Sequence, residues 1–153
     1  MSLKNRKEAI KNGEITLYQI PEEEKRKISE IIKTELEQED RIAFAYLFGS
    51  FIENAPFRDI DIAVFIENFE ESEWQYYEIA LPDKIEKKLN YPVDCKILND
   101  ADVFFAYNVV KGKLITVKNE ELWEDFLIYT LKLYADFYPY WIRHLKEVLS
   151  SGA

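Results

Sequence analysis

Cysteine and histidine are almost absent from this chain of 153 residues, which has one of each. A single cysteine excludes a disulfide within the chain and is compatible with a reducing compartment. A catalytic thiol needs an activating neighbour, and the one histidine, His144, has no recognisable sequence relationship to Cys95. We therefore interpret Cys95 as a packing residue.

Long hydrophobic runs are also missing. No stretch approaches the roughly 20 apolar residues that a membrane-spanning helix requires. The N-terminus is mixed and charged, and it does not resemble a signal peptide. We expect a soluble, cytoplasmic protein without a membrane partner.

Positive charge is in deficit, because 20 Lys and Arg residues face 29 Asp and Glu residues, giving a formal net charge of -9. Nucleic-acid binding gains much of its affinity from cationic side chains that neutralise phosphates. We therefore expect no extended nucleic-acid surface. The acidity also favours a bound cation wherever an anionic nucleotide is to be accepted.

What is present predicts one α/β (α+β) domain over residues 1–153, since the length is typical of a domain and 48% of residues are hydrophobic. Residues 120–149 are expected to form a C-terminal helical segment. Alternating helices and strands are predicted in the order α, β, α, β, α, β, α, β, α, with strands over 42–48, 59–66, 91–98 and 114–117. Residues 74–89 are expected to form a helix with Trp74 on its apolar side.

The ends of several elements are predicted from local signals. Pro21 before three glutamates marks a helix start. Asp100 and Asn119 are the expected N-caps of the last two helices. Apolar residues nearly alternate from Ile15 to Ile20, which predicts a short strand or an ordered arm.

The apolar run Ile42 to Phe48 ends in Gly49-Ser50. This pattern is typical of a buried strand that breaks into a helix, whose free backbone N–H groups can hold phosphate oxygens. Gly49 would allow close approach of the backbone, and Ser50 would add a hydroxyl donor. We predict a phosphate-binding corner here.

Asp59 and Asp61 follow after eight residues and open a second apolar segment. A strand period of two places both carboxylates on one face and Ile60 on the other. Such a pair alone is weak evidence, because surface turns often contain it, but its position after the glycine-serine corner favours a Mg²⁺ site.

Gly49-Ser50 and Asp59-x-Asp61 resemble the signature of the DNA polymerase beta type nucleotidyltransferases, and more narrowly the minimal nucleotidyltransferase (MNT) proteins. That family usually has ten residues between the two motifs, often with a glycine, whereas this chain has the eight residues 51–58 and no glycine. The turn 110–114 and the segment 134–139 are also similar, the latter to MNT antitoxins paired with HEPN toxins. The resemblance implies a small mixed sheet flanked by helices.

The family mechanism needs a third acid, for which Asp94 in the strand-like segment 91–98 is the candidate. Alternation places Asp94 and Lys96 on the same face. The resemblance implies that the third acid helps to bind a second metal ion and accepts the proton of the attacking hydroxyl. An exposed edge residue is the alternative. Lys96 either contacts the triphosphate or is a solvated charge. The same two alternatives hold for Arg58, for which contact with the triphosphate is the weaker one.

The resemblance implies that AMP is transferred from ATP, with two Mg²⁺ ions, to a tyrosine of a HEPN toxin, which would make the chain an adenylylating antitoxin. Asp59, Asp61 and Asp94 are then the catalytic and metal-binding residues, and Gly49, Ser50 and Lys96 bind the nucleotide. Two alternatives stay open: an antitoxin that binds the toxin without catalysis, and a small-molecule nucleotidyltransferase of the aminoglycoside-modifying kind. Homo-oligomer formation also stays open.

A long apolar stripe runs through the C-terminal segment from Leu122 to Val148 at spacings of three and four residues. We expect this stripe to cover the sheet, the alternative being contact with a helical partner. Pro139 should bend the helix because it lacks an N–H donor and clashes with the preceding turn.

Overall fold

The computed structural model describes residues 10–12 and 15–151 and contains a four-stranded sheet in the order β5-β4-β3-β6. The strands are β3 (Ile42–Phe48), β4 (Ile60–Ile66), β5 (Val93–Ile97) and β6 (Lys113–Val117). β3 pairs antiparallel with β4 and β6, whereas β4 and β5 are parallel, so the sheet is mixed. A separate antiparallel pair joins β1 (Ile10–Asn12) to β2 (Ile15–Leu17), which confirms the predicted short strand.

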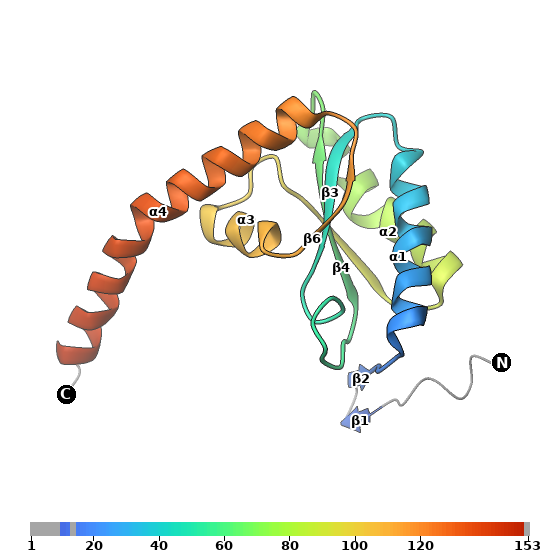
Figure 1. Cartoon of the computed structure of the whole chain (residues 1–153), viewed down its shortest axis with the longest axis horizontal. Coiled ribbons are helices and arrows are strands. Elements are labelled where there is room, and N and C mark those ends of the chain that lie inside the picture. The colour runs from blue at the N-terminus through green and yellow to red at the C-terminus, as the bar shows by residue number, and fades with distance from the viewer. Residues whose placement is uncertain (1–9, 13–14, 152–153) are drawn as a thin grey trace.

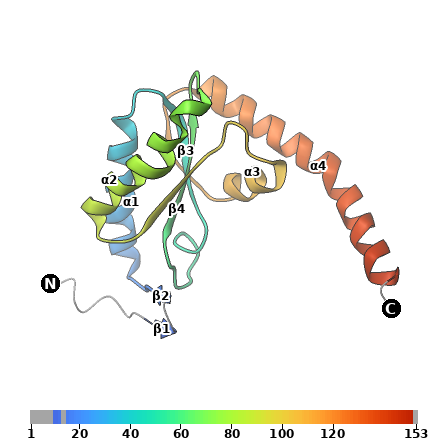
Figure 2. The same cartoon turned by 180° about the vertical axis from the view of Figure 1, so that it is seen from behind.

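Helices cover both faces of the four-stranded sheet (Figures 1 and 2). On one face, α1 (Glu22–Glu37) and α2 (Leu81–Leu89) contribute Ile32 and Ile85 to the larger core. On the other, α3 (Val103–Val110) and the start of α4 (Glu120–Ser151) pack against a second core. The predicted fold class, a small mixed sheet flanked by helices, is therefore confirmed.

Alternation along the central strands assigns side chains to these two cores. Ile60, Ile62 and Val64 of β4 are fully buried in the α1 and α2 core, whereas Ala63 belongs to the other core. Asp61 shares the parity of Ala63, so it lies on the face of α3 and α4. In β5, Cys95 is fully buried in the α1 and α2 core, in agreement with a packing role.

The helix expected directly after Ser50 is wrong, because residues 50–54 form a turn. The eight residues between Ser50 and Asp59 must return the chain to the neighbouring antiparallel strand. Phe51 and Phe57 are buried within this return, with ring centroids 5.1 Å apart. Backbone hydrogen bonds of 2.8 and 3.0 Å tie Phe57 to Tyr18. These contacts leave no room for a regular helix.

Of the two predicted N-caps, one is right and one is wrong. Asn119 Oδ1 accepts a 3.2 Å hydrogen bond from the N–H of Leu122 at the start of α4. Asp102, instead of Asp100, caps α3, because its Oδ1 accepts the N–H groups of Phe104 and Phe105 at 2.8 and 3.1 Å. The chain turns first through a hydrogen bond from Ala101 N–H to Leu98 O, so the helix begins two residues later.

The helix predicted over 74–89 is present but irregular. A 3-10 turn covers Glu71–Glu73 and a π-helical turn covers Tyr76–Ala80, ahead of α2. Pro82 lacks the N–H that would close a regular α-turn, so the widened turn falls where that donor is missing. Trp74 was expected on the apolar side, but it is 44% exposed.

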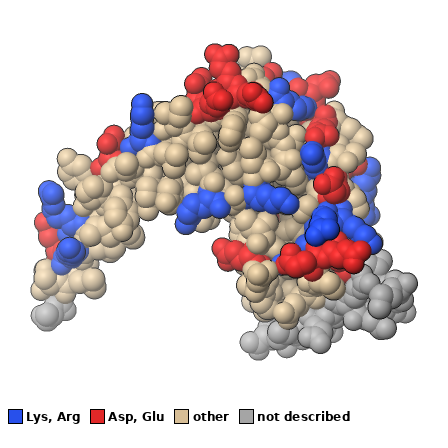
Figure 3. Space-filling model, viewed as in Figure 1, with Lys and Arg blue, Asp and Glu red and all other residues tan. Residues whose placement is uncertain are grey.

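The interpretation that the whole apolar stripe of α4 covers the sheet is wrong. A 32-residue helix is about 48 Å long at 1.5 Å per residue, about twice a seven-residue strand. Leu122 and Phe126 pack against the sheet, whereas Phe137 and Trp141 are about half exposed. The far half of α4 changes direction and leaves the sheet (Figure 2), and a wide hollow lies beneath it (Figure 3).

Aromatic contacts connect α4 to α3. The rings of Tyr107 and Tyr134 are stacked with centroids 3.5 Å apart, and those of Phe104 and Trp141 are 5.9 Å apart.

None of the described helices combines the length and the apolarity needed to cross a membrane.

Candidate active site

Three predicted acids lie at one end of the sheet. Asp61 of β4 is the register partner of Asp94 on parallel β5 and of Phe48 on antiparallel β3. Asp59 immediately precedes β4. The end of β3 and the starts of β4 and β5 therefore meet, and the chain positions Asp59, Asp61 and Asp94 beside Gly49.

The Asp61 carboxylate lies close to the negative charges of Asp59 and Asp94, which repel it. Burial, and after it the charges of Asp59 and Asp94, raise the pKa of this carboxyl from 3.8 to about 6, while the charge of Arg58 lowers it. In the described part of the chain, Asp61 has no ion pair. Asp59 Oδ2 lies 3.9 Å from Arg58 Nε, and Asp94 Oδ1 lies 3.9 Å from Lys96 Nζ. A cation bound among these groups would relieve the repulsion.

Gly49 and Asp61 are in direct contact. Gly49 has φ of +79°, and a Cβ added there would overlap Oδ2 of Asp61 and lie 3.2 Å from its Cγ. Glycine is therefore needed both for the left-handed conformation and for the space. Ser50 follows on the exposed surface, so a ligand phosphate can reach the turn from solvent.

The donor set suits a hard divalent cation. Among the described residues, no three or more His, Cys, Asp or Glu side chains are arranged so that they alone could hold a metal ion. Magnesium ions are commonly bound by one or two carboxylates together with substrate phosphates and water. Two or three mutually repelling carboxylates beside an open phosphate turn fit that pattern.

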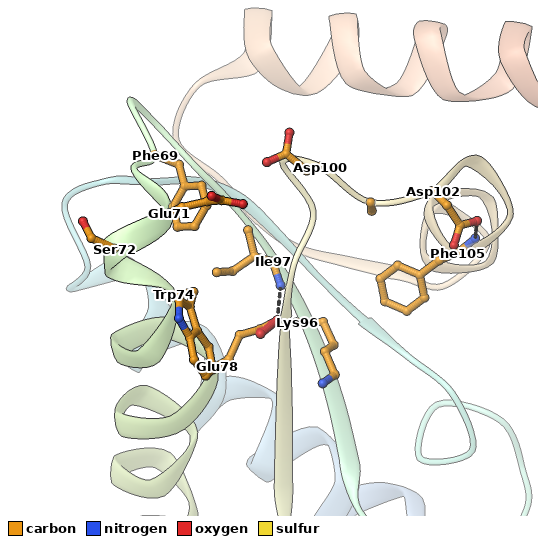
Figure 4. Close-up of a pocket in the computed structure, with 11 residues that line it drawn as sticks. Phe69, Glu71, Ser72, Trp74, Glu78, Lys96, Ile97, Asp100, Asp102 and Phe105 are labelled. Carbon is orange, nitrogen blue, oxygen red and sulfur yellow. Dashed lines mark hydrogen bonds between the residues drawn. The ribbon is translucent and has the colours of Figure 1, made fainter.

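A cavity of about 810 Å³ adjoins this group at Lys96 (Figure 4). Its aromatic walls are Phe69, Trp74 and Phe105. Four carboxylates surround it, from Glu71, Glu78, Asp100 and Asp102. No pattern in the sequence predicts this cavity, because its walls come from segments that are separate in the chain. An acidic stretch followed by tryptophan was the available signal.

A family model described as "Polymerase beta, Nucleotidyltransferase" matches residues 30–121, more than half of the chain. The matched range contains Gly49, Ser50 and all three acids. Among curated proteins, no match was found.

Solved structures with the same fold include chains from toxin–antitoxin complexes. One is a tri-AMPylated Shewanella oneidensis HEPN toxin in complex with MNT antitoxin, matched at 22% identity and TM-score 0.62 over 82% of this chain and 98% of that chain. A toxin–antitoxin with AMP-PNP matches at 23% identity and TM-score 0.63, over 79% of this chain and 98% of that chain. The toxin–antitoxin MntA-HepT matches at 21% identity and TM-score 0.57, over 84% of this chain and 99% of that chain. At these identities, the likeness establishes a shared fold.

Proposed function

The chain belongs to the Polymerase beta nucleotidyltransferase family, as its motifs predicted, and from this premise we propose that it transfers AMP from ATP to a hydroxyl group of a partner protein. The observation that carries the proposal is the convergence of Asp59, Asp61 and Asp94 beside Gly49. The raised pKa of Asp61 supports it, because perturbed carboxyls with a specific charge environment are common at catalytic sites.

Asp59, Asp61 and Asp94 are the proposed ligands of one or two Mg²⁺ ions. Bound there, Mg²⁺ would polarise the α-phosphate and neutralise charge on the leaving pyrophosphate. The three carboxylates would bind the ion fully deprotonated, since a proton on Asp61 competes with the metal.

Each remaining residue has a separate proposed task. The backbone at Gly49 and the hydroxyl of Ser50 hold phosphate oxygens, and Lys96 contacts the nucleotide. Asp94 accepts the proton of the acceptor hydroxyl while the oxygen of that hydroxyl attacks the α-phosphorus. The bond from the α-phosphorus to the bridging oxygen then breaks, and pyrophosphate leaves with that oxygen.

The proposed acceptor is a tyrosine of a HEPN-domain toxin. Transfer of AMP to this tyrosine would inactivate the toxin. Two features support a protein acceptor: the structural neighbours described as HEPN toxin and MNT antitoxin complexes, and the aromatic cavity on the Asp94 side. The far half of α4, with Phe137, Tyr140 and Trp141 exposed, offers area for such a partner.

The test is incubation with α-labelled ATP, Mg²⁺ and the protein product of the neighbouring gene. We expect label on a tyrosine of that protein, and far slower labelling when Asp94 is replaced by asparagine. A stable complex without label transfer would instead establish an antitoxin that acts by binding alone.

A second candidate function is nucleotidyl transfer to a polycationic small molecule of the aminoglycoside class. The four carboxylates around the 810 Å³ cavity favour it, because they suit ammonium groups. Adding kanamycin to the same reaction separates the two: label on kanamycin without any toxin present would support the small-molecule function.

A further inference from the structure

A cavity of about 410 Å³ lies between α3, α4 and the sheet, and we call it the α4 cavity. Its apolar walls include Phe65 of β4, Ala106 of α3 and Phe126 of α4. Phe65 follows Asp61 by four residues, about 13 Å along the strand. The α4 cavity is therefore separate from the carboxylates of the proposed active site. Its volume is within the range of about 300 to 1,000 Å³ that is common for small-molecule sites.

The hydroxyl of Thr130 is the unusual polar group of the α4 cavity. Thr130 lines the cavity and is 1% exposed, and no residue in the described ranges forms a hydrogen bond with its Oγ1. A threonine hydroxyl in a helix can bond the carbonyl of the preceding turn, but this one does not. Because an unpaired buried hydroxyl is unfavourable, a ligand with a polar atom at this position would gain a hydrogen bond.

Asp125 supplies negative charge at the solvent side of the same cavity. Its side chain is exposed and has no ion pair within the part of the chain that the structure describes. The adjoining cavity of about 580 Å³ shares Asp125 and adds the carboxylates of Glu67 and Glu121. No lysine or arginine is among the described residues that line either cavity. Figure 3 shows acidic side chains gathered over the start of α4, and their field favours a cationic ligand group.

Asp125 and Thr130 lie at opposite edges of the apolar stripe of α4. They are five residues apart, or about 7.5 Å along the helix axis. Phe126 and Tyr129 lie between them on the helix surface and also line the cavity. A ligand that reaches both polar groups therefore needs a cationic end, an apolar body and a second polar group at its far end.

We propose that the α4 cavity binds a protonated arylalkylamine that carries a hydroxyl group on its ring. The ammonium group pairs with Asp125, and the ring hydroxyl bonds Thr130 Oγ1. The ring packs against Phe65 and Phe126, whose own rings are 5.7 Å apart between centroids. Bound in this way, the ligand contacts β4, α3 and α4 together, so it stabilises the attachment of α4 to the sheet. This binding does not depend on nucleotidyl transfer.

The experiment is calorimetric titration with three probes: tyramine, phenethylamine, which lacks the hydroxyl, and tyrosol, which replaces the ammonium group by a neutral hydroxyl. We expect phenethylamine and tyrosol to bind about three- to tenfold more weakly than tyramine. Thr130→Val should remove the preference over phenethylamine, and Thr130→Ser should keep it. Asp125→Asn should remove the preference over tyrosol. Ala106→Leu fills the cavity and should weaken tyramine binding at least about tenfold.

Two control variants should bind tyramine as the parent protein does. Glu124→Gln removes an exposed neighbouring carboxylate of α4 that does not line the α4 cavity. Glu71→Gln removes a carboxylate of the large cavity at Lys96. Loss of tyramine binding in Glu71→Gln with unchanged binding in Asp125→Asn would place the amine at Lys96 and overturn the inference. Absence of tyramine binding to the parent protein overturns it too, as does equal affinity for all three probes.

Discussion

Gly49 has no space for a side chain, because a methyl group there would overlap Oδ2 of Asp61 and lie 3.2 Å from its Cγ. Its φ of +79° adds a conformational penalty for any other residue. We expect Gly49→Ala to lower the free energy of unfolding by about 1–2 kcal/mol and to abolish transfer by displacing Asp61. Urea denaturation measures the first effect. Ser50→Ala, at the exposed neighbouring position, is the control and should stay within about 0.5 kcal/mol of the parent. Equal stability of the two variants would contradict the contact.

Asp94→Asn tests the proposed proton acceptor. The amide is nearly isosteric but accepts a proton poorly, so we expect the rate of AMP transfer to fall by about 10² to 10⁴. Affinity for ATP should change far less, which single-turnover and equilibrium binding measurements can separate. Asp83→Asn is the matched control, since Asp83 is an exposed carboxylate of α2 that pairs with Lys87 at 3.0 Å. A rate within tenfold of the parent would remove Asp94 from the chemistry.

Asp61→Asn should stabilise the protein without metal at neutral pH. The pKa of Asp61 is raised from 3.8 to about 6 in the folded chain, so the folded state binds more protons than the unfolded state between these values. The contribution of Asp61 to the free energy of unfolding therefore falls as pH rises from about 4 to 6, and it stays low above pH 6.

Because the carboxyl is only half-buried, solvent screening reduces the effect, and we expect Asp61→Asn to gain about 1 kcal/mol at pH 7. The gain should become small near pH 3, where Asp61 is largely protonated in both the folded and the unfolded state. Urea denaturation of both proteins across this pH range measures it. A gain that does not depend on pH would mean that packing, not charge, is responsible.

Tyr46→Phe tests how the start of α4 is attached to the sheet. Trp123 Nε1 donates a 2.8 Å hydrogen bond to the hydroxyl of Tyr46, which is 3% exposed. Removing the acceptor leaves a partly buried N–H unpaired, so the free energy of unfolding should fall by about 1 kcal/mol. Thermal denaturation of Tyr140→Phe gives the control, since Tyr140 is 69% exposed. No difference between the two variants would show that water replaces the lost acceptor.

Much of the sheet could be predicted from alternation. Acidic and apolar residues alternate from Asp59 to Ile62, so the face of Asp61 followed from the strand period alone. The pairing of Asp61 with Asp94 required the order of strands, which depends on packing between distant segments. The resemblance to nucleotidyltransferases supplied that expectation.

Other features could not be read from the sequence, for physical reasons. Asp100 and Asp102 both precede an apolar run, and only the turn from Leu98 to Ala101 decides which one caps α3. The stripe on α4 predicts an apolar face but not how far the sheet extends beneath it. The large cavity at Lys96 is built by separate segments, and no local pattern encodes their meeting.

The fully buried Cys95 gives this fold an internal reporter. Burial raises the pKa of its thiol, and the nearby charges of Glu78 and Asp94 raise it further, so the sulfur is both hidden and protonated. An alkylating reagent can reach it only when the core between β5 and the helices α1 and α2 opens. Strand β5 also carries Asp94, so a ligand bound to Asp59, Asp61 and Asp94 should slow alkylation of Cys95. The alkylation rate of this one thiol then measures how often this edge of the sheet opens.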